Sequence, residues 1–230
     1  MARRSRRKRR TANTIAQLEW RDVENRYGPI NVLDETQVQT IIDGALEILQ
    51  SKGMRFLEPG SRKRLASAGA DVDEDTMMVR FDPSLVMERV AQAPSSFELR
   101  ARNPDRHLQF GTSYLNFASV GGPAFVSDLD KGRRPGTYAE MCDYLRLVQS
   151  LNIIHQEGGG PFEAMDLPAE TRHLDLYLAQ YRLTDKNFQS YALGGERARD
   201  SVEMACIALD LDRSALLDTP ALLAIINTNS

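Results

Sequence analysis

Three clusters of glycine recur in the second half of this chain, each after a short apolar run. They are Gly121-Gly122, Gly158-Gly159-Gly160 and Gly194-Gly195, and segments typical of amphipathic helices lie between them. A repeated order of strand, glycine loop and helix is typical of a parallel α/β sheet or a (β/α) barrel, whose active face is formed by the loops after the strands. One glycine pair would indicate only a turn. Three at equivalent places favour an edge where the backbone approaches a ligand.

Residues 117–230 are therefore predicted to form a parallel α/β sheet or a (β/α) barrel with roughly four strands. The first strand ends near Ser119, and a hairpin of Phe125–Ser127 with Arg133 follows it. Further strands are expected at Asn152–Gln156, Phe188–Leu193 and Leu222–Ile226, and helices are expected to begin at Thr137, near Asp166 to Pro168 and before Ala198. In the second of these helices the positions expected to face inward are Leu174, Tyr177, Leu178 and Tyr181.

Residues 34–116 show no strand–helix repeat and are predicted to form an α+β extension. Asp34 and Gln37 have the spacing of a capping box, and the helix that they open should end before Gly53. Its apolar stripe consists of Val38, Ile41, Ile42, Ala45 and Leu49. The other expected elements are helices near Ser61–Ala68 and from Asp82-Pro83, with strands at Met77–Phe81, Ser96–Arg102, His107–Phe110 and Ser113–Val120.

Residues 1–33 are predicted to be a basic, disordered tail followed by a surface arm that Trp20 and Tyr27 pin to the body. Seven of the first ten residues are Arg or Lys, and such blocks usually stay solvated. Because the whole chain carries −3, the remainder is acidic and should repel nucleic acid. A polyanion-binding role through the tail is thus an alternative that the acidic body disfavours.

The chain shows no apolar run near the length of about 20 residues that crosses a bilayer. No apolar region follows the basic block as it would in a secretory signal. Two cysteines in 230 residues do not make a disulfide framework. These features predict a cytoplasmic protein without a membrane partner.

His155 and Glu157 lie two residues apart at the end of the second predicted strand, so both side chains are expected to face the active mouth. A carboxylate there would stabilise a substrate with a fixed positive charge. The alternative is a polar pair that stabilises the strand end. The other candidate binding residues are Ser119, Gly121, Gly122, Gly158, Gly159, Tyr191, Gly194, Asn227, Thr228 and Asn229.

Aromatic faces can hold a cationic ligand by cation–π attraction, and those nearest the glycine loops are Phe117, Phe125, Phe162 and Tyr191. The alternative is that these aromatic residues belong to the core. A metal site is not predicted, because His107, His155 and His173 lack the spacing of metal ligands. The glycine clusters match neither a dinucleotide fingerprint nor a P-loop, which disfavours a nucleotide-binding fold.

Several phrases of the sequence resemble one known family when they are taken in order. They are S-V-G-G-P-A-F-V-S-D-L-D within 117–135, P-A-E-T-R-H-L-D at 168–175, L-T-D-K at 183–186 and the final I-N-T-N-S. Over roughly residues 30 to 230 the chain is similar to the trimethylamine–corrinoid methyltransferases, which include pyrrolysine enzymes and betaine-specific relatives without pyrrolysine. The resemblance implies a (β/α)8 barrel of the TIM type, of which residues 117–230 would be the first half, truncated after roughly four strands. Such a barrel passes a methyl group from a tertiary or quaternary amine to the cobalt of a corrinoid (cobalamin), which a partner protein carries. The candidate residues on the glycine loops would then bind the substrate or the corrinoid.

The first hypothesis is thus a corrinoid-dependent amine methyltransferase with binding sites on the glycine loops. The alternative is a non-catalytic half-barrel that acts only in binding or assembly. The first and fourth strands would have open edges, which predicts a homo-oligomer and an inactive chain when it is alone. Catalytic residues, and the pyrrolysine where there is one, would lie in the later half of the barrel, so the amine substrate stays open.

Overall fold

A computed structural model describes residues 15–28, 30–111, 113–122, 125–191 and 193–226. The predicted disordered block at the start of the chain and the candidate residues Asn227, Thr228 and Asn229 lie outside these ranges. The chain divides into two compact units, one of residues 26–95 and one of residues 1–25 with 96–230. The predicted boundaries at 34 and 117 stay predictions. None of the helices in the described ranges has the length and apolar character needed to span a membrane.

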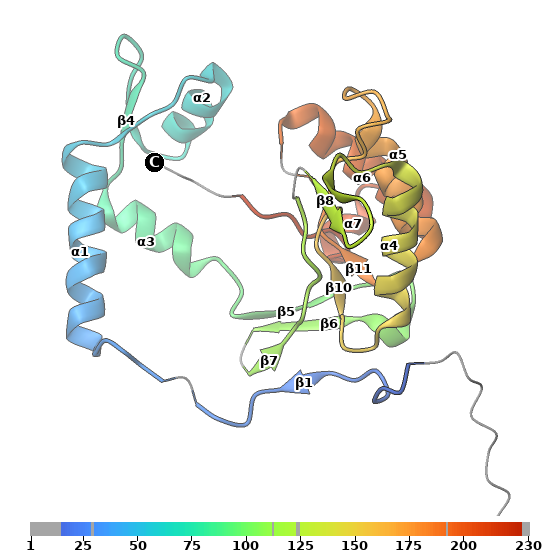
Figure 1. Ribbon diagram of the computed structural model, residues 1–230. Helices are drawn as coiled ribbons and strands as arrows, with labels where there is room; N and C mark the ends of the chain where they lie inside the picture. The colour runs from blue at the N-terminus through green and yellow to red at the C-terminus, as the bar shows by residue number, and fades with distance from the viewer. Residues whose placement is uncertain (1–14, 29, 112, 123–124, 192, 227–230) are drawn as a thin grey trace, which may run out of the picture. The chain divides into compact units, whose positions relative to one another are not determined.

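Within residues 26–95, three helices accompany a small antiparallel sheet (Figure 1). The helices are α1 (Glu35–Ser51), α2 (Pro59–Ser67) and α3 (Pro83–Ala91). The sheet has the order β2-β4-β3, formed by β2 (Met54–Arg55), β4 (Met78–Arg80) and β3 (Asp71–Asp73). The capping box of α1 is confirmed, since the Gln37 amide donates to Asp34 Oδ1 at 2.8 Å and the Asp34 amide donates to Gln37 Oε1 at 3.0 Å.

The predicted inner stripe of α1 is only partly correct. Val38, Ile41 and Ala45 are exposed, whereas Ile42 and Leu49 are half-buried, and no residue of α1 is fully buried. Within its own unit the helix contacts only α3 and β4 substantially, and so small a set of neighbours covers a narrow strip of its surface. Periodicity identified the helix correctly but not how much of its apolar face is covered.

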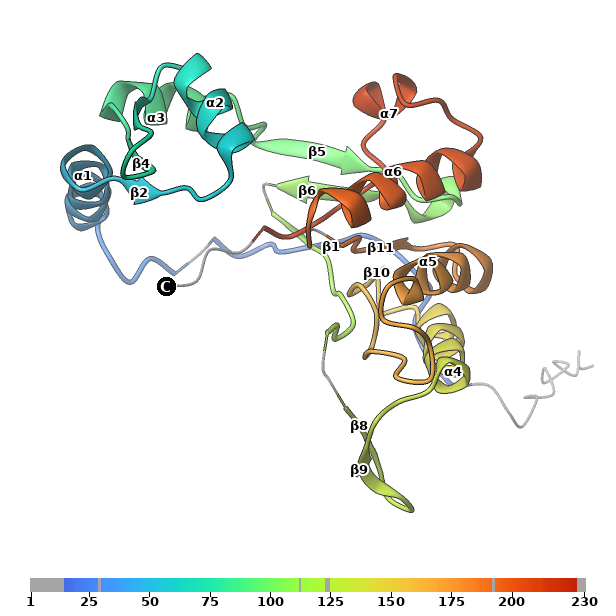
Figure 2. The same cartoon turned by 90° about the horizontal axis from the view of Figure 1, so that it is seen from above.

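The unit formed by 1–25 and 96–230 begins with antiparallel pairs. Strand β5 (Ser96–Leu99) pairs with β6 (Leu108–Gly111) around the short 3-10 helix η1 (Pro104–Arg106). The predicted strand 113–120 divides in two: β7 (Tyr114–Leu115) pairs with β1 (Val23–Glu24) of the arm, and Ala118 makes a separate parallel bridge. The hairpin of β8 (Val126–Asp128) and β9 (Gly132–Arg134) is confirmed and extends away from the rest of its unit (Figure 2).

Four short segments of this unit run parallel and follow one another in chain order. Ala118 bridges Gln156, β10 (Gln156–Glu157) pairs with β11 (Asn187–Phe188), and Gln189 bridges Leu223. The mixed α/β class is therefore confirmed, but the ladders are short and the described residues form no closed barrel. The predicted strands were too long: 152–156 contributes only its last residue to β10, and 188–193 contributes Phe188 to β11 and Gln189 to a single bridge.

Helices α4 (Tyr138–Ser150), α5 (Arg172–Leu183) and α6 (Gly195–Leu209) pack side by side against these segments, and the short α7 (Ala215–Asp218) follows them (Figure 1). Their core is formed by Met141, Leu145, Ala164, Leu176 and Ala179. The predicted inner face of α5 is wrong for Leu174 and Leu178, which are exposed. The buried face of α5 includes the polar residues His173 and Gln180, so the apolar pattern alone placed the stripe incorrectly.

Candidate functional site

A cavity of about 440 Å³ lies at the carboxyl ends of the four parallel segments. Six predicted binding residues line it: Ser119, Gly121, Gly122, Gly158, Gly159 and Tyr191. Ala118, Gln189, Ser190, Leu193 and Ile225 complete the lining. The prediction that the glycine loops meet at one edge agrees with this geometry, since the lining comes from all four segments.

The first two glycine loops pack backbone against backbone, which explains why they contain glycine. A Cβ atom at Gly121 would lie 2.0 Å from the carbonyl oxygen of Gly158, and one at Gly158 would lie 2.1 Å from that of Ser119. The Gly122 amide donates to the Gly160 carbonyl at 2.9 Å, and the Gly158 amide donates to Ser119 Oγ at 3.1 Å. The absence of side chains therefore lets the two loops form one continuous wall.

The side chains that line the cavity are uncharged. Ser119 supplies a hydroxyl group and Gln189 supplies a carboxamide. The Ser190 hydroxyl already donates a hydrogen bond to the Leu223 carbonyl at 3.0 Å. Gln189 follows Phe188, whose ring contacts Tyr181 on the helix side, so strand alternation turns Gln189 toward the opposite face. Tyr191 adds a phenol that stays neutral because burial raises its pKa, so the cavity offers hydroxyl, amide and backbone groups without a carboxylic acid or an amine base.

Glu157 does not face the cavity, contrary to the prediction. Its fully buried carboxylate accepts hydrogen bonds from Gln180 Nε2 of α5 at 2.5 Å and from the Gly159 and Gly160 amides at 3.0 Å each. Burial raises the pKa of the Glu157 carboxyl, although these donors oppose the shift. The carboxylate turns toward the helices because its hydrogen-bond donors lie there.

His155 is also buried, and both of its ring nitrogens bind backbone groups. The Phe117 amide donates to Nδ1 at 3.0 Å, and Nε2 lies 3.1 Å from the Arg21 carbonyl, which can only accept. These partners require a neutral ring with its proton on Nε2, and burial lowers the pKa of His155 in agreement. The structure thus favours the interpretation as a stabilising polar residue: His155 joins the arm, whose Trp20 packs edge-on at 5.8 Å, to the first parallel segment.

The lowered pKa of His155 predicts an acid-sensitive attachment of the arm. Since the unfolded chain binds the proton more readily than the folded one, the stability from neutral His155 is present above about pH 6.5 and is lost as the pH falls through the lower folded-state pKa. Urea denaturation between about pH 7.5 and 5, followed by the fluorescence of Trp20, the only tryptophan, should show this loss. His155→Gln should flatten the dependence, and an unchanged slope would contradict the assignment.

Of the four aromatic residues named as possible cation-binding groups, Tyr191 lines the cavity and the three phenylalanines do not. Phe117 stacks on His155 at 5.7 Å, and the Arg133 guanidinium lies 3.8 Å from the centroid of the Phe125 ring. Tyr191 lines the cavity, but its ring packs edge-on against Tyr177 at 5.9 Å. Gly194 is the N-cap of α6 with a φ of 83° and does not line the cavity.

Gln189 and Ser190 were not among the predicted binding residues, although both lie inside the predicted third strand. Alternation along Phe188–Leu193 places residue 189 on the same face as residue 191. Gln189 could therefore have been predicted as a binding residue together with Tyr191. Among the described residues no group of three or more His, Cys, Asp or Glu side chains could hold a metal ion. The expectation of no metal stays a prediction.

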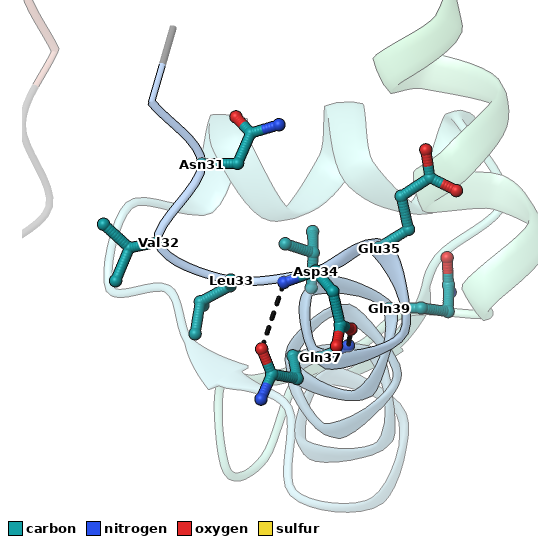
Figure 3. A pocket seen from close by; sticks show the side chains of 8 residues that line it. Asn31, Val32, Leu33, Asp34, Glu35, Gln37 and Gln39 are labelled. Atoms are coloured by element: carbon teal, nitrogen blue, oxygen red, sulfur yellow. Dashed lines mark hydrogen bonds between the residues drawn. The ribbon is translucent and has the colours of Figure 1, made fainter.

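A larger hollow of about 800 Å³ adjoins the first turn of α1 but lacks the features of a binding site (Figure 3). One continuous segment, Asn31 to Gln39, lines it, and Figure 3 shows the Asp34 and Gln37 groups occupied by the capping box. Its lining residues are exposed, and no distant part of the chain converges on it. The cavity at the parallel segments is therefore the candidate site.

Comparison with known proteins assigns the chain to a family. The family model described as trimethylamine methyltransferase (MTTB) matches residues 1–230. The chain belongs to this family. It is 30% identical over 198 residues to a glycine betaine methyltransferase of Desulfitobacterium hafniense (strain Y51), an alignment that covers 86% of the chain and 41% of that relative. It is 24% identical over 127 residues to the trimethylamine methyltransferase MttB of D. hafniense (strain DSM 10664 / DCB-2), covering 55% of the chain and 25% of that relative.

The chain thus spans less than half the length of these curated relatives. Family membership confirms the resemblance found in the sequence and identifies a methyltransferase family. The names of the two relatives refer to glycine betaine and to trimethylamine.

Proposed function

We propose that the chain takes part in methyl transfer from a quaternary amine of the betaine type to a corrinoid protein, and that the cavity holds part of the methyl donor. The observation that carries this proposal is the convergence of six predicted binding residues on one cavity in a member of this family. The four parallel segments would then be the start of a (β/α) barrel, whose active face lies at the carboxyl ends of its strands.

The uncharged lining favours a quaternary amine over a tertiary one. When a methyl group leaves a quaternary nitrogen, the C–N electron pair stays on nitrogen and a neutral tertiary amine departs without a proton. A tertiary amine leaves as readily only in its protonated form, whose N–H donor is best stabilised by a carboxylate beside it. Ser119, Gln189 and the glycine amides supply no carboxylate, so a betaine suits the lining better.

The same lining fits the periphery of a corrinoid. The volume of the cavity, about 440 Å³, lies within the common range for small-molecule sites and exceeds the volume that a small amine needs. Gln189 and the backbone groups of the glycine loops could hydrogen-bond the neutral amide groups at the edge of a corrinoid ring. When bound, the corrinoid supplies the cobalt that accepts the methyl group. This chain would orient the methyl donor and exclude water.

Isothermal titration with a series of amines tests the proposed substrate class. Glycine betaine should bind more tightly than dimethylglycine or trimethylamine, and Gln189→Leu should weaken its binding by about tenfold or more. Gln92→Leu, at the exposed C-cap of α3, is the matched control and should bind as the wild type does. Equal affinity for all three amines, or wild-type affinity in Gln189→Leu, would exclude the proposed role of the cavity.

A further inference from the structure

The proposed binding chemistry does not use the buried Glu157, yet several hydrogen-bond donors are arranged around its carboxylate. Its carboxylate has no exposed surface, and within the described residues no ion pair reaches it. A buried carboxylate is costly unless several donors satisfy it. Here the Gly160 amide is shared between Oε1 at 3.0 Å and Oε2 at 3.1 Å, and Gly159 and Gln180 also donate to Oε2.

The glycine loop is shaped around this carboxylate. Gly159 and Gly160 have φ values of 94° and 97°, a left-handed conformation that favours glycine. In this conformation their consecutive amides point to the same side, and such a run of amides forms an anion-binding concavity. Glu157, which supplies the anion, directly precedes the loop. Glu157 and Gly158–Gly160 therefore form one local hydrogen-bonded turn.

The loop that Glu157 organises is the wall of the cavity. Gly158 and Gly159 line the cavity, and the Gly160 carbonyl accepts the Gly122 amide from the opposite loop at 2.9 Å. A Cβ atom at Gly159 would lie 3.1 Å from the Gln189 carbonyl, so the loop also borders the third segment. Loss of the carboxylate charge would therefore change both sides of the cavity without touching a ligand.

The hydrogen bonds around Glu157 indicate which charge state of its carboxyl they suit. Every hydrogen bond to its carboxylate comes from a donor, as an ionised carboxylate needs. Gln180 directs its amide nitrogen to Glu157 and leaves its own buried Oε1 without a partner. From β11 the uncharged Phe188 lies beside Glu157, and the Tyr177 and Tyr181 phenols that neighbour Phe188 stay neutral because burial raises their pKa.

We propose that Glu157 is a positioning residue whose ionised carboxylate holds Gly158–Gly160 as the cavity wall and thereby sets the affinity for the methylated amine. The effect on affinity rests on the proposed function, whereas the organisation of the loop does not. Protonation would turn one carboxylate oxygen into a hydroxyl donor, remove the negative charge and so weaken the hydrogen bonds from the Gly159 and Gly160 amides. The loop should therefore be ordered above the pKa of Glu157 and disordered below it.

The amide resonances of the loop test this proposal directly. In the wild-type chain the ¹H–¹⁵N signals of Gly159, Gly160 and Gly122 should shift together in one titration between about pH 8 and pH 4. Glu157→Gln keeps the side-chain size but removes the charge, and its loop signals should not titrate. Glu203→Gln, on the exposed surface of α6, is the matched control and should titrate as the wild type does.

Glycine betaine affinity supplies the second measurement. Glu157→Gln should weaken binding about tenfold or more at pH 7.5 and make it independent of pH, while wild-type affinity should fall toward that value on acidification. If wild type shows no binding, the proposed function fails, and the loop titration still decides the role of Glu157. Loop signals that do not titrate in the wild type overturn the proposal even if Glu157→Gln fails to fold, as does wild-type affinity in a folded Glu157→Gln.

Discussion

Replacing Gly158 with alanine is expected to break the cavity wall and to lower the free energy of unfolding of its unit by about 3 kcal/mol. The new Cβ would lie 2.1 Å from the Ser119 carbonyl oxygen and 3.1 Å from the Gly121 amide nitrogen. Both are backbone atoms, so no rotamer change can relieve the overlap. Gly121→Ala should behave alike, because its Cβ would meet the Gly158 carbonyl oxygen at 2.0 Å.

Urea denaturation followed by Trp20 fluorescence measures this loss, because Trp20 packs on His155 within the same unit. Gly195→Ala is the matched control, since a Cβ there meets no atom within 4 Å and the residue begins helix α6. It should unfold at the wild-type urea concentration or slightly above it. Equal midpoints for Gly158→Ala and Gly195→Ala would show that the two loops are not in contact.

A comparable loss is expected when Lys186 is replaced with methionine. Lys186 is 3% exposed, and its ammonium donates to the carbonyls of Val148 at 2.6 Å and Leu151 at 2.7 Å. These carbonyls end helix α4, where a positive charge is favourable. Burial, with a contribution from Arg106, lowers the pKa of Lys186 to about 8, so the ammonium form still predominates at neutral pH.

Lys186→Met would leave both carbonyls buried without their charged partner, at a loss of about 3 kcal/mol in the free energy of unfolding. Lys131→Met, on the exposed turn of the β8–β9 hairpin, provides the control and should change stability by about 0.5 kcal/mol or less. The same fluorescence-detected denaturation compares them. Should both variants unfold together, Lys186 would not be a structural link between α4 and β11.

The sequence allowed the local structure to be predicted wherever a short-range signal determines it. The capping boxes at Asp34 and Thr137 mark the starts of α1 and α4. The glycine clusters located the loops that meet at the cavity, because close approach of two backbones requires glycine at Gly121 and Gly158. These features depend on residues within a few positions of one another or on sterics that only one residue type satisfies.

Side-chain direction at the site could not be predicted, because it depends on partners distant in sequence. Strand alternation suggested that Glu157 faces the mouth of the cavity, but β10 has only two residues. The direction of the Glu157 side chain is set instead by the hydrogen-bond donors of the glycine loop and of Gln180. The phrase L-T-D-K likewise has a structural role that spacing does not reveal. Thr184 Oγ1 donates to Gln149 Oε1 at 2.7 Å, and Gln149 Nε2 donates to Asp185 at 2.8 Å.

Mapping of glycine betaine on the amide resonances tests the central claim most directly. If the cavity holds the methyl donor, the largest ¹H–¹⁵N shift changes should fall on Gly121, Gly158, Gly159 and Gln189, which line it. The amides of 31–39, beside the larger hollow, should not change. Saturable shifts confined to 31–39, with none at the glycine loops, would contradict the assignment of the site.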